Sequence, residues 1–176
     1  ASTVPDRELD EGLEMLATSE AGAIYVVDSF GALYSEQVHF LVKKYMGYCK
    51  ATRKEVGVHM HNNMQLAYAN TIEGIIEGAN LLDATMAGLG RGAGNCPMEL
   101  LLGFLRNPKY NLRPVLDCVQ NHIEPMRAKL LWGYDLPYLL TGMLNQHPRT
   151  AIKFKEAELK GVKGDILDFY DTVTGQ

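Results

Sequence analysis

Apolar residues along the first hundred positions predict three short strands, each followed by a helix. Residues 23–28 form a nearly continuous apolar run, which is typical of a parallel strand covered on both faces. Residues 56–61 and 81–86 predict two further strands. Apolar positions recur at helical spacing over about 35–50 and 64–78, and an amphipathic helix is expected before the first strand. This order predicts an α/β fold with a parallel sheet and helices packed outside it.

The helical pattern also predicts which side chains face inward. The segment 35–50 has the clearest period, at Val38, Leu41, Val42, Tyr45 and Met46. For 64–78 the expected inward residues are Leu66, Ala69, Ile72 and Ile76. Thr3 is expected to cap the first helix, with Pro5 in its first turn.

The pattern changes after residue 107, where strands are no longer evident and prolines recur. We therefore predict two parts, a catalytic α/β part over 1–107 and an α-helical extension over 108–176. An apolar stripe through the extension is expected to continue across a kink at Pro125. The residues after about 160 are expected to form a weakly ordered tail.

Composition narrows the class of protein. The 176 residues carry 17 basic and 21 acidic side chains, a net charge of -4, without a basic run, so nucleic acid and anionic membranes are not the expected partners. No apolar run reaches the ~18 residues of a membrane span. The three cysteines are scattered, which favours reduced thiols and a cytoplasmic location.

The chemistry of the sequence is concentrated in the strand 56–61, which carries His59 and His61 on alternate positions. Side chains two residues apart in a strand share a face, so both imidazoles are expected on one face and Met60 on the other. Two neighbouring imidazoles form half of a divalent-metal site. Asn62 and Asn63 are expected to end the strand and cap the next helix.

Other polar residues follow the neighbouring strands. Asp28 and Ser29 end the first strand, and Asp83 and Asn95 lie in or after the third. Asp28, Asp83 and Asn95 are candidate oxygen donors, because the carboxyl ends of parallel strands meet at one edge of the sheet. The glycine-rich loop 88–95 is neither a Walker A nor a dinucleotide motif. It fits a tight turn that lets backbone approach a ligand, or a phosphate cradle.

These motifs together resemble a known family. The segments 28–33 (Asp-Ser-Phe-Gly-Ala-Leu), 59–63 (His-Met-His-Asn-Asn) and 88–95 (Gly-Leu-Gly-Arg-Gly-Ala-Gly-Asn) resemble the last three strands of the HMG-CoA-lyase-like, or DRE-TIM, metallolyases. The nearest resemblance is to their 4-hydroxy-2-oxovalerate aldolase branch. The resemblance covers about residues 1–106 and implies the C-terminal part of a TIM (β/α)8 barrel.

The resemblance also implies roles for particular residues. His59 and His61 would be metal ligands, Ser29 would help to hold the pyruvate carboxylate, and Asn95 is a further candidate ligand. A tyrosine of the extension would reach the site, and either Tyr134 or Tyr138 fits. The implied cofactor is a divalent metal, Mn²⁺ or Mg²⁺, with Zn²⁺ and Co²⁺ as alternatives.

The family's first strand, which would supply the third ligand and an arginine, has no counterpart in these residues. Asp6-Arg7-Glu8 spells a similar motif but lies at a helix start, so we interpret it as coincidence. The expected partners are therefore a missing N-terminal barrel half or further copies of the chain, together with a small 2-keto acid. An open barrel half would leave uncovered sheet edges, so a homo-oligomer is also expected.

The resulting functional hypothesis is a metal-dependent aldolase that cleaves a 4-hydroxy-2-keto acid to pyruvate and an aldehyde through a stabilised enolate, with this segment alone inactive. Two alternatives stay open: a condensing synthase that joins an acyl-CoA and a 2-keto acid, and a non-catalytic barrel half.

Overall fold

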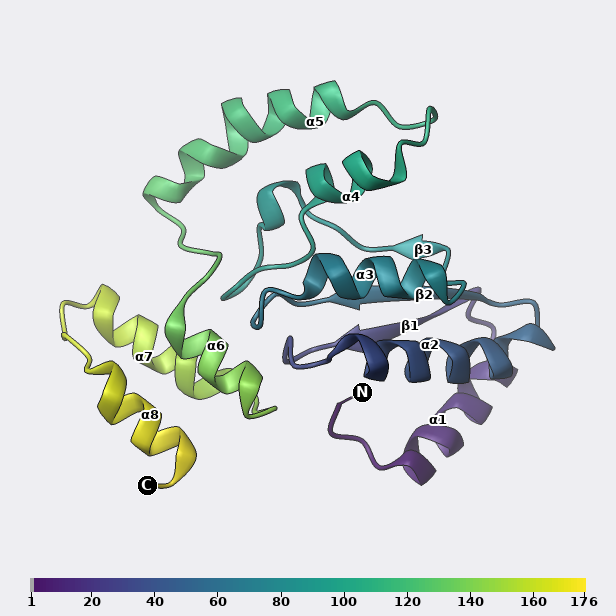
Figure 1. Cartoon of the computed structure of the whole chain (residues 1–176), viewed down its shortest axis with the longest axis horizontal. Coiled ribbons are helices and arrows are strands. Elements are labelled where there is room, and N and C mark those ends of the chain that lie inside the picture. Colours follow the sequence, from purple (N-terminus) through teal and green to yellow (C-terminus); the bar gives the residue numbers. More distant parts are fainter. Residues whose placement is uncertain (1) are drawn as a thin grey trace.

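The computed structural model describes residues 2–176 and contains a parallel sheet with strand order β1-β2-β3. The strands are β1 (Ala23–Asp28), β2 (Glu55–Met60) and β3 (Leu81–Leu82), and Val27 pairs with His59 in the register of β1 and β2. Helix α1 (Asp6–Thr18) precedes the sheet, and α2 (Ser35–Lys50) and α3 (Ala67–Ile76) connect its strands (Figure 1).

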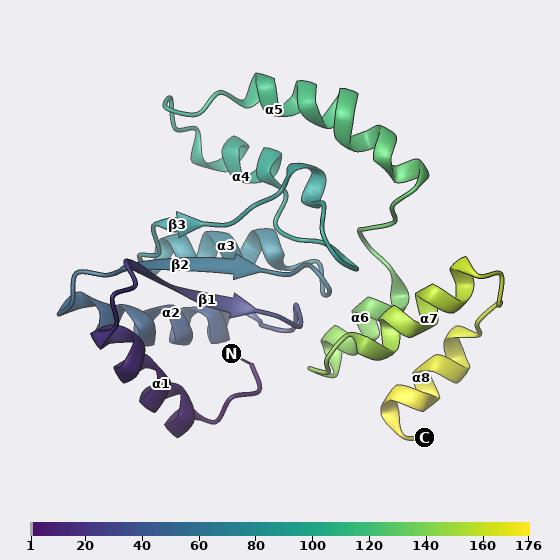
Figure 2. The ribbon, with the colours of Figure 1, turned by 180° about the vertical axis from the view of Figure 1, so that it is seen from behind.

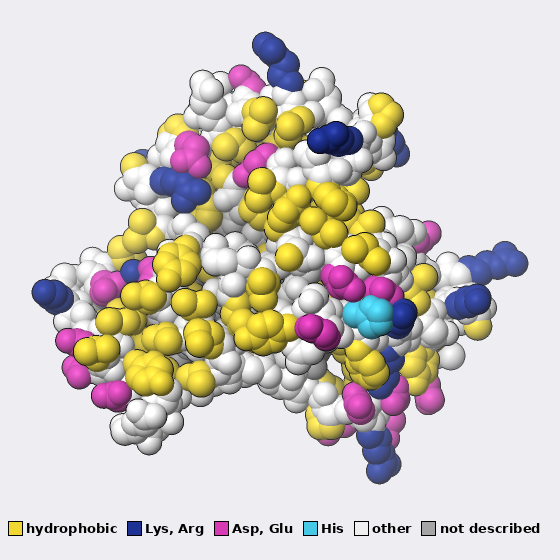
Figure 3. All heavy atoms as spheres, in the orientation of Figure 1, with side chains coloured by type: hydrophobic (Ala, Val, Ile, Leu, Met, Phe, Trp, Pro, Cys, Tyr) yellow, Lys and Arg dark blue, Asp and Glu magenta, His cyan; other side chains and the backbone are white. Residues whose placement is uncertain are grey.

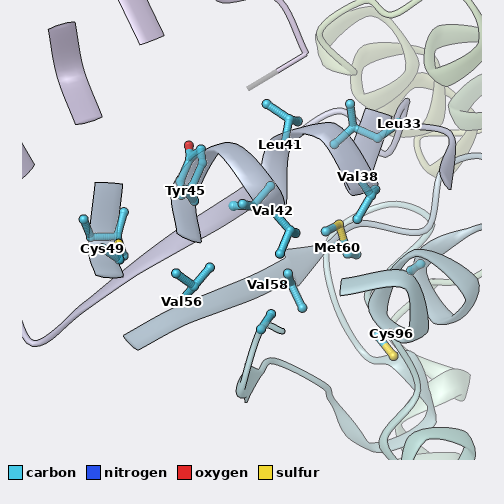
Figure 4. Packing of buried hydrophobic residues seen from close by; sticks show 14 of the residues in the cluster. Leu33, Val38, Leu41, Val42, Tyr45, Cys49, Val56, Val58, Met60 and Cys96 are labelled. Carbon is cyan, nitrogen blue, oxygen red and sulfur yellow. The ribbon is translucent and has the colours of Figure 1, made fainter. Parts of the chain in front are cut away.

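Helices α2 and α3 pack on one face of the sheet. From behind, the strands lie in front of these two helices and turn their other face to the viewer (Figure 2). The core between the layers joins Val26 and Val58 of the sheet to Val38 and Val42 of α2, and all four are fully buried (Figure 4). Burial of this apolar layer stabilises the packing of α2 on the sheet.

The rest of the chain is helical, and its elements lie beside the carboxyl ends of the strands and above β3 (Figure 1). A 3₁₀ turn (Met86–Gly88) precedes α4 (Met98–Leu105), α5 (Leu112–Cys118), a π turn (Val119–Ile123), a second 3₁₀ turn (Glu124–Ala128), α6 (Leu136–Met143), α7 (Arg149–Leu159) and α8 (Ile166–Thr174). A separate buried cluster holds α6, α7 and α8 together through Tyr138, Ala151, Phe169 and Val173.

Several predicted elements are confirmed. The predicted helix 35–50 is α2, with the expected inward positions except that Met46 is only partly buried. The strands at 23–28 and 56–61 are present with bounds within one residue of the prediction. The Pro125 region does break the helix, since regular α-helix gives way first to the π turn and then to the 3₁₀ turn.

Helix α3 buries a different face from the one predicted. Its buried positions are Ala67, Asn70, Thr71 and Gly74, and Ile76 is 68% exposed. Small residues allow α3 to approach β2 closely, since a Cβ on Gly74 would lie 2.8 Å from Cγ1 of Val58. The prediction was wrong because it ranked residues by hydrophobicity, whereas the close packing of α3 on β2 requires small residues at the contact.

The third strand and the two ends of the chain also differ from the prediction. Regular β3 covers only Leu81–Leu82, and beyond it Thr85 forms an isolated bridge to Pro97. Pro5, rather than Thr3, occupies the N-cap position of α1. The predicted weakly ordered tail is helix α8, whose N-terminus is capped by the carboxylate of Asp165.

Candidate metal centre

The imidazoles of His59, in β2, and His61, directly after β2, meet at the carboxyl edge of the sheet. His59 and His61 point to the same side, with their Nε2 atoms 3.3 Å apart and ring planes at 72°, while Met60 between them is buried on the other side. Two neighbouring ligand nitrogens at about 2.0–2.1 Å from one metal ion lie roughly 2.9–3.4 Å apart, depending on the coordination angle. The spacing therefore fits a shared ion.

Asp83 fixes the orientation of the first imidazole. Asp83 directly follows β3, the strand next to β2, and its Oδ2 lies 2.9 Å from Nδ1 of His59. A carboxylate at Nδ1 holds the proton there, which leaves the lone pair on Nε2 facing His61. This carboxylate–imidazole contact is the arrangement that usually supports a metal-binding histidine.

His61 is partly buried and stays uncharged at neutral pH. Burial of the ring lowers the pKa of His61 to about 4, and repulsion from His59 in its protonated form and from Arg91 adds to the decrease. A neutral imidazole keeps a lone pair for a metal, so His61 does not have to lose a proton before it can act as a ligand.

The glycine-rich loop places Asn95 beside His61. It forms an antiparallel bridge with His61, so the two side chains share one side of the backbone. Its Oδ1 is buried and has no hydrogen-bond donor among residues 2–176, whereas its Nδ2 donates to the carbonyl of Leu89. A buried acceptor without a donor is costly, and a cation at this point would satisfy it.

The loop reaches this position only because of its glycines. Gly94 has φ +83°, and a Cβ added there would lie 2.1 Å from the carbonyl oxygen of Gly88. The Gly94 carbonyl accepts a hydrogen bond from the backbone N–H of Asn62, at 2.9 Å, which ties the loop to the end of β2. The predicted tight turn is present, and approach of its backbone to a ligand stays a prediction.

An open hollow of about 310 Å³ adjoins the imidazole of His59. It is lined by His59, Leu82, Asp83, Ala84, Thr85 and Asn95. Because its walls combine two titratable groups and an amide, it offers space for a small polar ligand directly beside His59.

Asp28 does not belong to this set. It pairs with Met60 in the register, so it lies on the opposite face from the imidazoles. Its buried carboxylate accepts the backbone N–H groups of Ala32 (3.1 Å) and Leu33 (3.0 Å). Burial raises the pKa of Asp28, opposed by these hydrogen bonds. The prediction of Asp28 as an oxygen donor is wrong, because the turn after β1 uses both of its oxygens.

Ser29 is exposed and lies at the edge where the imidazoles emerge. The backbone N–H of His61 donates to the carbonyl of Asp28, the residue before Ser29, at 3.4 Å. The two strand ends are therefore adjacent, and Ser29 stays a candidate for substrate contact.

The two tyrosines of the extension have different surroundings. Tyr134 is 62% exposed, whereas Tyr138 is 9% exposed and packs on the glycine-rich loop, where a Cβ on Gly92 would meet its ring at 2.6 Å. Burial raises the pKa of Tyr138, and the charge of Asp135 adds to the rise. The structure brings Tyr138 to the loop that carries Asn95, and leaves Tyr134 on the surface.

The sequence alone did not single out Arg91, whose charge acts on both His61 and Tyr138. It stands in the middle of the glycine-rich loop, where only the glycines drew attention. The available signal was that Arg91 is the one charged residue in the loop 88–95.

Comparisons with known proteins identify the family of this chain. The sequence profile of the HMGL-like family matches residues 1–122. The chain belongs to the HMGL-like family. A 4-hydroxy-2-oxovalerate aldolase of Thermus thermophilus is 39% identical over 113 residues, 64% of this chain and 31% of that protein. An oxaloacetate decarboxylase of Mycobacterium tuberculosis is 43% identical over 83 residues, 47% of this chain and 24% of that protein.

A solved structure gives the same result for the fold. The N-terminal domain of a proposed aldolase from Bacteroides vulgatus superposes with a TM-score of 0.64 at 35% identity, covering 76% of this chain and 44% of that one. The expected fold, part of a TIM barrel, is thereby confirmed. The chain spans less than half the length of each of these three proteins. No helix among residues 2–176 is long and apolar enough to cross a membrane.

Proposed function

We propose that this chain supplies the metal-binding strand of a divalent-metal-dependent aldolase that cleaves a 4-hydroxy-2-keto acid to pyruvate and an aldehyde. The observation that carries the proposal is the pair of Nε2 atoms of His59 and His61, 3.3 Å apart at the carboxyl edge of the sheet. The similarity to a 4-hydroxy-2-oxovalerate aldolase supports this substrate class.

His59 and His61 would hold the ion, with Asn95 Oδ1 as a third donor. Imidazole ligands favour Mn²⁺ over Mg²⁺, and Zn²⁺ and Co²⁺ also suit them. When bound, the ion supplies a Lewis acid that stabilises negative charge developing on the keto oxygen of the substrate. The unpaired Asn95 Oδ1 and the neutral imidazole of His61 are what make these residues fit a cation.

The chain's own residues would do the remaining work at this edge. Asp83 keeps the Nδ1 proton on His59, so that its Nε2 stays a ligand throughout the reaction. Ser29, exposed beside the imidazoles, would donate a hydrogen bond to the substrate carboxylate. Tyr138, packed on the loop of Asn95, would exclude water from that side.

Two histidines and an amide leave the remaining ligand and the proton-transfer group to be supplied from elsewhere. We propose that further barrel strands or another copy of the chain complete the site, and that the completed enzyme is a cytoplasmic homo-oligomer. The unpaired cysteines, Cys49, Cys96 and Cys118, support a reducing compartment.

The test uses the completed enzyme. With 4-hydroxy-2-oxovalerate as substrate, we expect equal amounts of pyruvate and aldehyde to form, and we expect His59→Ala to abolish both metal content and cleavage. Unchanged metal content in this variant would refute the assignment of His59. Release of CoA from an acyl-CoA would instead support a synthase, and a completed barrel without metal would support a non-catalytic role.

Oxaloacetate decarboxylation is a second candidate, favoured by the 43% identity to an oxaloacetate decarboxylase over 83 residues. Both reactions form pyruvate, so pyruvate alone does not separate them. The co-product does, because the decarboxylase releases carbon dioxide and the aldolase releases an aldehyde. Measuring both co-products with each substrate decides between the two activities.

A further inference from the structure

A second group of side chains with the chemistry of metal ligands lies on the outer helices, on the opposite side of the sheet from His59 and His61. His39 of α2, Glu73 of α3 and Glu77, the C-cap residue of α3, bring their ligand atoms within 4.8 Å of one another, the only such group of three found among residues 2–176. Figure 3 shows a histidine beside acidic and basic side chains on this face of α2 and α3.

The distances suit a single small ion. Nδ1 of His39 lies 2.8 Å from Oε1 of Glu77 and 3.5 Å from Oε1 of Glu73. Ligand atoms about 2.0–2.2 Å from one Zn²⁺ ion in tetrahedral geometry are roughly 3.3–3.5 Å apart, so a small opening of the shorter contact would admit the ion. Glu73 and Glu77 are one helical turn apart, so both carboxylates reach the same point.

The burial of the carboxylates favours an ion over solvent. The side chain of Glu77 is only 11% exposed and that of Glu73 is 24% exposed, against 45% for His39. Two carboxylates held close together and partly withdrawn from water repel each other, and a divalent cation would neutralise both.

Lys43 is the present neutralising group, and it lies on the outer side of the cluster. Its Nζ is 3.5 Å from Oε2 of Glu77 and 3.1 Å from Nε2 of His39. The ammonium donates to Nε2, which leaves the imidazole proton on Nδ1, directed at Glu77. Metal binding at Nδ1 requires this proton to move to Nε2, so Lys43 must withdraw from the ring and competes with the ion.

We propose that His39, Glu73 and Glu77 form a zinc-type site that links α2 to α3. One imidazole nitrogen and two carboxylate oxygens provide three ligands, and water provides the fourth. The two helices cover the sheet behind β2, so the ion would brace the strand that carries His59 and His61 without contacting the candidate metal centre.

The experiment is a calorimetric titration with Zn²⁺ of this chain carrying His59→Ala and His61→Ala, which removes the other imidazole pair. We expect one Zn²⁺ per chain and a rise of the melting temperature with Zn²⁺ concentration. Adding Glu77→Gln should weaken binding at least about a hundredfold, since loss of even an outer-shell partner costs about 10- to 100-fold. Glu14→Gln, an equal change of charge on α1, should leave binding unchanged.

Lys43→Met provides a test of opposite sign. Removing the competing ammonium should tighten Zn²⁺ binding about two- to tenfold, as expected for one exposed charge near a divalent ion. Absence of Zn²⁺ binding in the double histidine variant would overturn the proposal, as would equal affinity in Glu77→Gln and Glu14→Gln. If Glu77→Gln does not fold, Glu73→Gln carries the same comparison.

Discussion

Asp83 offers the sharpest test of how the candidate metal centre is supported. Its carboxylate contacts Nδ1 of His59 at 2.9 Å. Asp83→Asn keeps the size of the side chain and an oxygen acceptor but removes the charge. Asp83→Ala removes the acceptor as well, so the two variants separate charge from orientation.

The expected magnitudes follow from the exposure of the contact. Loss of an outer-shell partner typically lowers metal affinity about 10- to 100-fold. The side chain of Asp83 is 47% exposed, so water screens part of its charge. We therefore expect about a tenfold loss, or about 1.4 kcal/mol, for Asp83→Asn. For Asp83→Ala, which frees the His59 ring to turn, we expect up to about a hundredfold loss.

The assay is a titration with Co²⁺, which prefers imidazole ligands and reports binding through its visible absorption. His39→Ala in the background removes the cluster on α2 and α3. Asp117→Asn, an exposed change of the same charge on α5, is the matched control and should bind Co²⁺ as the parent does. Equal affinity of Asp83→Ala and the control would refute the view that this carboxylate orients His59.

Three further changes test the fold around the site. Gly94→Ala should lower the free energy of unfolding in urea by about 3 kcal/mol or more, because it places a Cβ against the Gly88 carbonyl on a left-handed backbone. A loss below about 1 kcal/mol would show that the loop can move. Burial raises the pKa of Asp28 above its unfolded value, so ionisation of Asp28 disfavours the folded state. The stability of the parent relative to Asp28→Asn should therefore rise as the pH falls through the pKa of folded Asp28. A stability difference that does not depend on pH would contradict this. The hydrogen bond from Lys44 lowers the pKa of Asp10. The stabilisation by this bond is therefore present above the unfolded pKa of Asp10 and is lost as the pH falls through the folded pKa. Asp10→Asn should remove this contribution to acid unfolding, measured by circular dichroism.

The sequence was most informative where one periodicity applies throughout an element. Alternation along 56–61 correctly placed His59 and His61 on one face and Met60 on the other. The same held for α2, whose regular apolar spacing predicted both bounds. In these segments the local pattern and the tertiary packing demand the same side chains, so periodicity alone was sufficient.

Prediction failed where tertiary contacts, rather than local pattern, decide the outcome. Helix α3 needs small residues against β2, so Gly74 faces inward and Ile76 outward. Asp28 looked like a free donor because nothing local shows that backbone N–H groups four and five residues later occupy its oxygens. The helix α8 was missed although Asp165 is a good N-cap, because its buried partners lie in α6 and α7.

The helical extension contributes to the candidate metal centre through the loops that follow the strands. Trp132 donates its indole N–H to the carbonyl of Ala87 at 2.9 Å, which holds the start of the glycine-rich loop. Gly142 of α6 lies against the other two loops, since a Cβ there would be 3.4 Å from the Gly31 carbonyl and 3.1 Å from Cβ of Asn63. The strands are fixed by α2 and α3, whereas their loops are fixed by the extension. The direction of the imidazoles therefore depends on α2 and α3, and the position of Asn95 depends on the extension. The hydrogen bond from Asn62 to the Gly94 carbonyl and the bridge between His61 and Asn95 couple these two packing layers, so a change in either should affect both sets of ligands.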